Sequence, residues 1–213
     1  MGGRVLITRP LPGAAQTAER LEALGFESVC LPLTEIRSTF AELPPGHDFD
    51  AVAIPSANAV RHAQPALLRA LAGLPVFTVG RRTAEAATEA GLAAPTVGPG
   101  DGQGLAVLMA GRLARSTRVV YLCGRVRTRS FEETLRAAGI EVTPVEAYDT
   151  VTLDYTGTEL AEALGNKAFD AILLYSRAAA QAFLNLTDRS VILPWPVERR
   201  VPAPRYSSPG PRT

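Results

Sequence analysis

The chain has 213 residues, of which 46% are hydrophobic and 20% charged, which is the composition of a globular protein with one large or two small domains. Its formal net charge is +1, so the overall charge indicates neither a nucleic-acid partner nor a membrane surface. The N-terminal apolar run is too short for a signal peptide, and no stretch reaches the roughly 18 apolar residues of a membrane span, so we expect a cytoplasmic protein.

Short runs rich in Val, Ile and Leu alternate with helical patterns along the chain. The first unit consists of a predicted strand at residues 5–8, a helix at 13–24 and a strand at 28–31. Gly25 stands where a helix C-cap glycine is expected. This alternation predicts an α/β fold with parallel sheets and crossover helices.

The same alternation continues to about residue 186. Further strands are predicted at 51–54, 76–79, 118–122, 141–145 and 171–175, and further helices from Ser56, at 82–90, at 130–138 and at 176–186. The glycine-rich stretch 97–104 does not have the spacing of a dinucleotide-binding or phosphate-binding loop, because Gln103 stands at a position that would require glycine. We therefore expect a flexible loop there.

Two repeats indicate the domain organisation. F-D-A-V-A-I-P-S at 49–56 returns as F-D-A-I-L-L-Y-S at 169–176, and L-E-A-L-G-F-E at 21–27 returns as L-R-A-A-G-I-E at 135–141. Because the copies are interleaved, we expect two similar α/β domains, the second inserted into the first. The extended stretches 31–37 and 145–151 would cross between them as a two-stranded linker.

The domain boundaries follow from these repeats and from composition. The first domain would comprise residues 1–34 and 151–193, and the inserted second domain residues 38–147. Residues 194–213 are so rich in proline and arginine that we expect a disordered tail without a packed element.

Polar or cationic residues follow nearly every predicted strand. The carboxyl ends of parallel strands form the usual binding edge of such a sheet, where free helix N–H groups and arginine forks attract anions. This pattern predicts a site for a polyanionic small molecule in the cleft between the two domains. For Ser56 and Ser176 the alternative is a helix N-cap, which contributes about 1 kcal/mol. The residues in this pattern are Arg9, Ser56, Asn58, Arg61, Arg81, Arg82, Thr83, Arg125, Arg127, Arg129, Ser176 and Arg177.

Other chemistries find little support. The two histidines, His47 and His62, form no identifiable Ser–His–acid set, and we expect them to be solvated or capping residues. Cys30 and Cys123 lack metal-ligand spacing and are predicted to be buried thiols, so no metal site is expected. A receiver-like signalling domain would need an acidic cluster at the strand ends, where this chain has serine, glycine and arginine.

Ordered motifs from residue 4 to about 186 resemble the uroporphyrinogen-III synthase family. The resemblance implies two flavodoxin-like domains joined by a two-stranded linker, and a cofactor-free lyase. The stretches that carry it are V-L-I-T-R-P, L-E-A-L-G-F, L-P-L-T-E-I, I-P-S-A-N-A-V, V-F-T-V-G-R-R-T-A-E-A-A, V-E-A-Y-D-T-V and F-D-A-I-L-L-Y-S.

The implied substrate is hydroxymethylbilane, a linear tetrapyrrole with eight carboxylates. Loss of hydroxide gives an azafulvene, which attacks ring D to form a spiro-pyrrolenine, and the macrocycle then closes with ring D inverted. The resemblance also implies a monomer in haem biosynthesis that receives its substrate from hydroxymethylbilane synthase.

The resemblance assigns roles to particular residues. Tyr148 matches the tyrosine of the second linker strand and would assist hydroxide loss, the alternative being a tyrosine packed on that strand. The predicted substrate-binding residues are Arg9, Ser56, Asn58, Gly80, Thr83, Gly124, Arg125 and Ser176.

The chain departs from the family pattern in two places. Cys123 and Thr128 stand where relatives have arginines, with Arg125, Arg127 and Arg129 nearby as substitutes. Relatives also continue past the Ser176 helix with further strands and helices, where this chain has its proline–arginine tail. We therefore expect an incomplete first domain, from truncation or a frameshift. The alternative function is a non-catalytic relative that binds a carboxylated tetrapyrrole.

Overall fold

The computed structural model describes residues 2–46 and 48–188, and its backbone divides into two compact units. One unit is formed by Met1–Leu33 together with Asp154–Thr213, and we call it the terminal unit. The other, the inserted unit, is Thr34–Leu153. His47 and the predicted tail at 194–213 lie outside the described residues.

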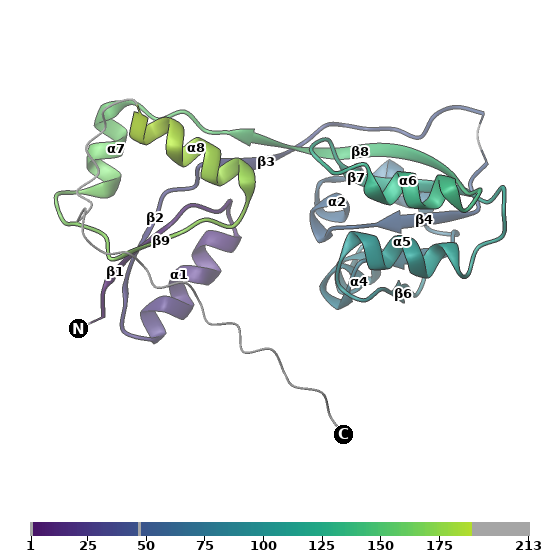
Figure 1. Ribbon diagram of the computed structural model, residues 1–213, viewed down its shortest axis with the longest axis horizontal. Coiled ribbons are helices and arrows are strands. Elements are labelled where there is room, and N and C mark those ends of the chain that lie inside the picture. The colour runs from purple at the N-terminus through teal and green to yellow at the C-terminus, as the bar shows by residue number, and fades with distance from the viewer. Residues whose placement is uncertain (1, 47, 189–213) are drawn as a thin grey trace, which may run out of the picture. The chain divides into compact units, whose positions relative to one another are not determined.

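The terminal unit is built on three parallel strands in the order β2-β1-β9. Helix α1 lies on one side of these strands, and α7 and α8 lie on the other (Figure 1). The buried cluster of this unit joins Leu6 of β1 to Leu160 and Leu164 of α7 and to Ala182 of α8. The elements are β1 (Arg4–Ile7), α1 (Gly13–Ala23), β2 (Glu27–Cys30), α7 (Gly157–Leu164), β9 (Ala171–Leu173) and α8 (Arg177–Asp188).

The inserted unit has six strands in the order β3-β8-β7-β4-β5-β6, and every pair is parallel except β3 with β8. Helices α5 and α6 lie side by side over one face in Figure 1. The elements are β3 (Thr34–Ser38), β4 (Ala51–Ile54), α2 (Ala57–His62), α3 (Pro65–Leu71), β5 (Val76–Thr78), α4 (Arg81–Glu89), β6 (Thr96–Val97), α5 (Gly102–Ala110), β7 (Arg118–Gly124), α6 (Ser130–Ala137) and β8 (Glu141–Thr152).

Helices cover both faces of this sheet, and the central strand β4 is therefore apolar at every position. Val52 and Ile54 of β4 pack with α2, α3 and α4, whereas Ala51 and Ala53 pack with α5 and α6. All four residues are fully buried. A continuous apolar run is what a parallel strand between two helical layers requires.

Strands β3 and β8 form the antiparallel pair that the sequence predicted for the two crossing stretches. Their register runs from Thr34 opposite Thr152 to Ser38 opposite Tyr148. Strand β8 continues from its parallel pairing with β7 into this antiparallel pairing with β3. Tyr148 thus lies on one long strand where its pairing with β7 ends and its pairing with β3 begins.

The two Phe-Asp-Ala repeats place an aspartate in the same role in each unit. The Asp50 carboxylate accepts a hydrogen bond from the backbone N–H of Arg118 at 2.7 Å, and that of Asp170 accepts one from Arg4 N–H at 2.8 Å. In return, the backbone N–H of each aspartate donates to the carbonyl of the same arginine. Each aspartate therefore fixes the start of the neighbouring strand, as expected for a residue that shapes a turn.

Some expectations from the sequence are wrong in detail. The stretch 97–104 is not one flexible loop: Asp101 caps α5 by accepting from Gly104 N–H at 2.7 Å, and the helix begins at Gly102. Cys30 is exposed on the outer strand β2, whereas Cys123 is buried as predicted. Helices α3 and α7 were not predicted, although Thr156 and Glu159 form a capping box before α7.

None of the helices in the described ranges is both long and apolar enough to span a bilayer.

Replacing Asp50 by alanine should lower the free energy of unfolding by about 1 kcal/mol, because Arg118 N–H loses a charge-assisted partner. Urea unfolding measures this change. Asp48→Ala is the matched control, since Asp48 is exposed in the same turn, and it should change stability little. Equal stability of the two variants would contradict the role given to Asp50.

Candidate functional site

Four of the predicted site residues lie at the carboxyl edge of the inserted unit's sheet. Ser56 and Gly80 follow β4 and β5, and Gly124 is the last residue of β7. These three strands are parallel neighbours, so their carboxyl ends lie at one edge. Tyr148 of β8 joins them because it lies opposite Gly124 in the β7–β8 register.

A β-bulge determines which way Tyr148 points. In the β7–β8 pair, Cys123 lies opposite Glu146, and the next residue of β7, Gly124, lies opposite Tyr148. Ala147 of β8 therefore has no partner on β7 and is the extra residue of the bulge. Ala147 packs with α2 and its neighbours, and regular alternation would turn Tyr148 to the opposite face. Tyr148 instead packs against the same cluster as Ala147. The bulge therefore turns the Tyr148 side chain towards α2.

Gly124 leaves the space that the Tyr148 ring occupies. A Cβ atom on Gly124 would lie 2.6 Å from Cζ and 2.9 Å from the hydroxyl oxygen of Tyr148. Such distances are well inside van der Waals contact. The next residue, Arg125, donates its backbone N–H to the Tyr148 carbonyl at 2.9 Å. The backbone and ring of Tyr148 are thus both held against the end of β7.

Ser56 has two partners at this edge. Its hydroxyl accepts the backbone N–H of Asn58 at 3.2 Å and so caps α2, which was the structural alternative for this serine. The Ser56 side chain also lies beside the Tyr148 phenol. Burial raises the pKa of Tyr148, and the neighbouring Ser56 hydroxyl partly opposes this rise. The phenol is therefore protonated at neutral pH and able to donate.

His62 is a neighbour of Tyr148 that the sequence did not reveal. Its ring lies 6.3 Å from the Tyr148 ring, centroid to centroid, at a tilt of 44°. Burial, with a smaller contribution from Arg61, lowers the pKa of His62. His62 ends α2 just as Ser56 precedes it, and only the packing of α2 along β8 brings both side chains to one tyrosine.

The start of α4 presents backbone and cationic groups. Gly80 precedes the helix without a side-chain cap, and Arg81 and Arg82 are exposed. Neither arginine forms an ion pair with another residue of the described ranges. Thr83 is 4% exposed, which places it in the packed first turn of the helix.

Arg125 already has carboxylate partners within the chain. Its guanidinium donates to Glu146 at 3.2 Å and to Asp149 at 3.0 Å. The side chain nevertheless remains 58% exposed. Arg125 therefore lies at the predicted edge but is occupied by two acidic side chains.

The remaining predicted residues, Arg9 and Ser176, lie together in the terminal unit. They follow β1 and β9, which are parallel neighbours. The Arg9 guanidinium lies 4.5 Å over the ring of Tyr175, the residue before Ser176. Ser176 accepts the N–H of Ala179 at 3.1 Å within the first turn of α8. The predicted residues thus form two groups, one at the carboxyl edge of each unit's sheet.

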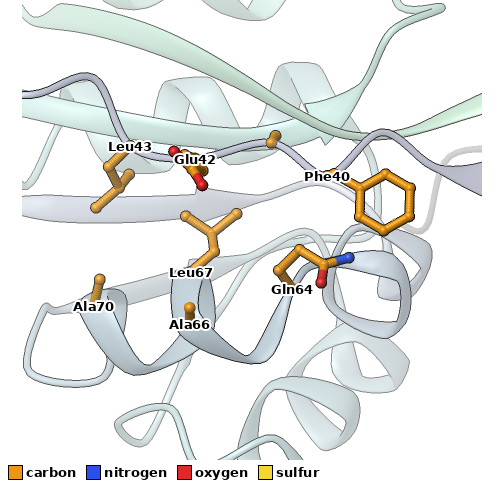
Figure 2. Close-up of a pocket in the computed structure, with 8 residues that line it drawn as sticks. Phe40, Glu42, Leu43, Gln64, Ala66, Leu67 and Ala70 are labelled. Carbon is orange, nitrogen blue, oxygen red and sulfur yellow. The ribbon is translucent and has the colours of Figure 1, made fainter.

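A separate groove of about 350 Å³ lies in the inserted unit between residues 40–43 and α3 (Figure 2). Phe40, Leu43 and Leu67 make it largely apolar, and its polar side chains are Glu42 and Gln64. The lining contains no cationic side chain, so this groove does not suit a polyanion. Groups of three or more His, Cys, Asp or Glu residues with metal-site geometry are also absent from the described part of the chain.

Comparisons with known proteins point to one family. A family model for uroporphyrinogen-III synthase HemD matches residues 15–202. The porphyrin biosynthesis protein HemD of Ruminiclostridium josui is 22% identical over 196 residues, which cover 86% of this chain and 39% of that protein. The chain therefore spans about two fifths of the length of this curated relative.

Solved structures share the fold at low sequence identity. A uroporphyrinogen-III synthetase from Helicobacter pylori 26695 aligns with a TM-score of 0.60 and 18% identity, covering 87% of this chain and 78% of that one. A mutant uroporphyrinogen III synthase from the extremely thermophilic bacterium Thermus thermophilus aligns with a TM-score of 0.56 and 20% identity, covering 86% and 77%. These alignments establish an α/β fold with parallel sheets.

Gly124→Ala should displace the Tyr148 ring and lower the free energy of unfolding by about 1–3 kcal/mol, because the new methyl group overlaps the ring. A double-mutant cycle with Tyr148→Ala, measured by urea unfolding, isolates this contact. In the Tyr148→Ala background the alanine at 124 should have little effect. An equal loss in both backgrounds would show that the overlap is not with Tyr148.

Stability should fall as pH rises above about 9. Burial raises the pKa of Cys123 to about 12 and also raises those of Tyr121 and Tyr148. A group whose pKa is higher in the folded state contributes its full stabilisation below the pKa of the unfolded state, which is near 8.5 for Cys and 10 for Tyr. This contribution is lost as pH rises from the unfolded-state pKa towards the folded-state pKa. Urea unfolding from pH 7 to pH 10.5 should show a slope of up to about 1.4 kcal/mol per pH unit for each ionising group. Cys123→Ala should remove the part of this slope that begins near pH 9.

Proposed function

Since the chain belongs to the uroporphyrinogen-III synthase family, we propose that it is a lyase that converts hydroxymethylbilane to uroporphyrinogen III. The observation that carries this proposal is the half-buried Tyr148 phenol, held between Ser56 and Gly124 at the carboxyl edge of the inserted unit's sheet. A protonated phenol in this position supplies the weak acid that hydroxide loss requires.

The proposed reaction begins at the hydroxymethyl group of the substrate. Electron density from the attached pyrrole expels the hydroxyl group, which takes a proton with help from Tyr148 and departs as water. The resulting azafulvene bonds to the substituted α-carbon of ring D and gives a spiro-pyrrolenine. Breakage of the bond between ring D and its former neighbour, followed by closure at the other α-carbon, inverts ring D. These steps exchange protons and carbon–carbon bonds, with no net redox change, and we propose that no cofactor takes part.

The substrate's acetate and propionate groups require donors. In the inserted unit, we assign this role to Ser56, Asn58 and the Gly80 end of α4, with Gly124 leaving room for the Tyr148 ring. Thr83, which was also predicted, is 4% exposed, and we assign it no substrate contact. In the terminal unit we assign it to Arg9 and Ser176. For Arg125 to take part, a substrate carboxylate must replace Glu146 or Asp149, and its exposed position is compatible with such an exchange.

The proposal extends to the surroundings of the reaction. We propose that the two units are flavodoxin-like domains, and that each can bind substrate carboxylates at the carboxyl edge of its own sheet. We further propose a cytoplasmic monomer that receives hydroxymethylbilane from its synthase.

A coupled assay tests the function directly. Hydroxymethylbilane is supplied, the products are oxidised, and isomer III is resolved from isomer I, which forms spontaneously. We expect isomer III in excess over the uncatalysed reaction. Isomer I alone would contradict the proposed synthase, and tight binding of the substrate without turnover would favour the non-catalytic alternative.

Tyr148→Phe should lower kcat for isomer III by roughly 10- to 100-fold without abolishing it, because positioning of the substrate persists when the phenol is lost. Tyr155→Phe is the matched control, since the Tyr155 hydroxyl donates to the Pro32 carbonyl in the terminal unit and has no assigned catalytic role. Unchanged kcat in Tyr148→Phe would remove Tyr148 from the chemistry.

A further inference from the structure

Arg127, one of the arginines that the sequence offered as a substrate-binding substitute, lies in the first turn after β7 and points back into the inserted unit. We propose that Arg127 is a positioning residue for Tyr148 and does not bind substrate carboxylates. This inference takes the catalytic role of Tyr148 from the proposed function. The contacts that place Arg127 next to the bulge are independent of that function.

The Nε and Nη1 groups of Arg127 donate to four acceptors. It donates to the carboxylates of Glu132 at 3.1 Å and Glu146 at 2.9 Å. It also donates to the backbone carbonyls of Gly124 at 3.3 Å and Arg125 at 3.2 Å. Its side chain is 19% exposed, against 58% for Arg125. A substrate carboxylate would therefore have to reach a mostly buried group that already pairs with two carboxylates.

Glu132 makes any movement of the Arg127 guanidinium towards a substrate unfavourable. Its side chain is 5% exposed, and its second oxygen, Oε2, has no hydrogen-bond partner among the described residues. A buried carboxylate without its cation is strongly destabilising. Arg127 is the cation that pairs with the buried Glu132 carboxylate.

Two of the four acceptors, Gly124 and Glu146, lie on the two strands that pair at the bulge that turns Tyr148. Gly124 is the residue against which the Tyr148 ring packs, and its carbonyl is bonded to Arg127. Glu146 is the last residue of β8 in regular register before the bulge, and a hydrogen bond from Arg127 is the largest cause of its lowered pKa. Arg127 holds Glu146 towards α6, which carries Glu132, while Tyr148 packs towards α2.

Loss of the Arg127 guanidinium should change the position of Tyr148. Without the guanidinium fork, the β7 end and the β8 bulge are no longer tied to each other, and regular alternation of β8 would turn Tyr148 away from Ser56. A lysine retains the charge but not the planar fork that reaches two carboxylates and two carbonyls. Arg127→Lys should therefore fold and still misplace Tyr148.

Two variants and one control test this inference on the full chain. Arg127→Lys retains the charge, and the double variant Arg127→Gln/Glu132→Gln removes the fork without leaving a buried charge unpaired. Arg118→Gln is the control, because Arg118 lies at the opposite end of the same strand and its side chain pairs with Asp50 at 3.6 Å. The measurements are kcat and KM for isomer III, and fluorine NMR of protein labelled with fluorotyrosine.

The labelled protein has five tyrosines, and the resonance missing from Tyr148→Phe identifies Tyr148. In both Arg127 variants we expect this resonance to shift or broaden, kcat to fall about 10-fold or more, and KM to stay within about 2-fold, since misplacement of a catalytic group affects turnover before binding. The Arg118→Gln spectrum and kinetics should match the parent.

A raised KM with unchanged kcat and an unmoved Tyr148 resonance would make Arg127 a substrate ligand and overturn the inference. An unmoved resonance in both Arg127 variants would also overturn it, whatever the activity. Should the parent form no isomer III, the proposed function fails, whereas a shifted Tyr148 resonance in the variants would still support the positioning role.

Discussion

The close contact between Gly124 and the Tyr148 ring is the constraint on which the rest of this edge depends. A methyl group at position 124 would overlap the ring, so the end of β7 has to be glycine if the phenol is to lie there. The bulge at Ala147 turns the ring to this face, and Ser56 at the start of α2 meets its hydroxyl. Burial in this packing raises the pKa of Tyr148, so the phenol stays protonated and can donate a hydrogen bond to the departing hydroxyl group of the proposed reaction.

The arginines of the inserted unit divide into two kinds by their partners. Arg127 is enclosed by carboxylates and carbonyls, and Arg125 is shared between Glu146 and Asp149 at the surface. Arg81 and Arg82 are exposed and make no ion pair in the described ranges. An arginine that neutralises internal carboxylates serves the fold first, because its removal leaves a buried charge unpaired. A count of arginines near strand ends therefore overstates the cationic charge available to a polyanion.

Much of the fold was predictable because its causes are local. Apolar runs between two helical layers identified β4 and β7, Gly25 ended α1, and the repeated Phe-Asp-Ala stretches located equivalent strands in both units. The ends of those strands placed Ser56, Gly80 and Gly124 at one edge. Helix α5 was missed because the glycines before it resemble a loop, and the Asp101 cap that starts it was not recognised.

The sequence by itself determined which residues are candidates, since strand and helix periodicities and motif order are properties of neighbouring residues. Only the tertiary structure decided what each candidate does. The bulge that turns Tyr148, the approach of His62 and the pairing of Arg127 with Glu146 each depend on another element of the chain. Such contacts arise when whole strands and helices pack, and no local periodicity records them.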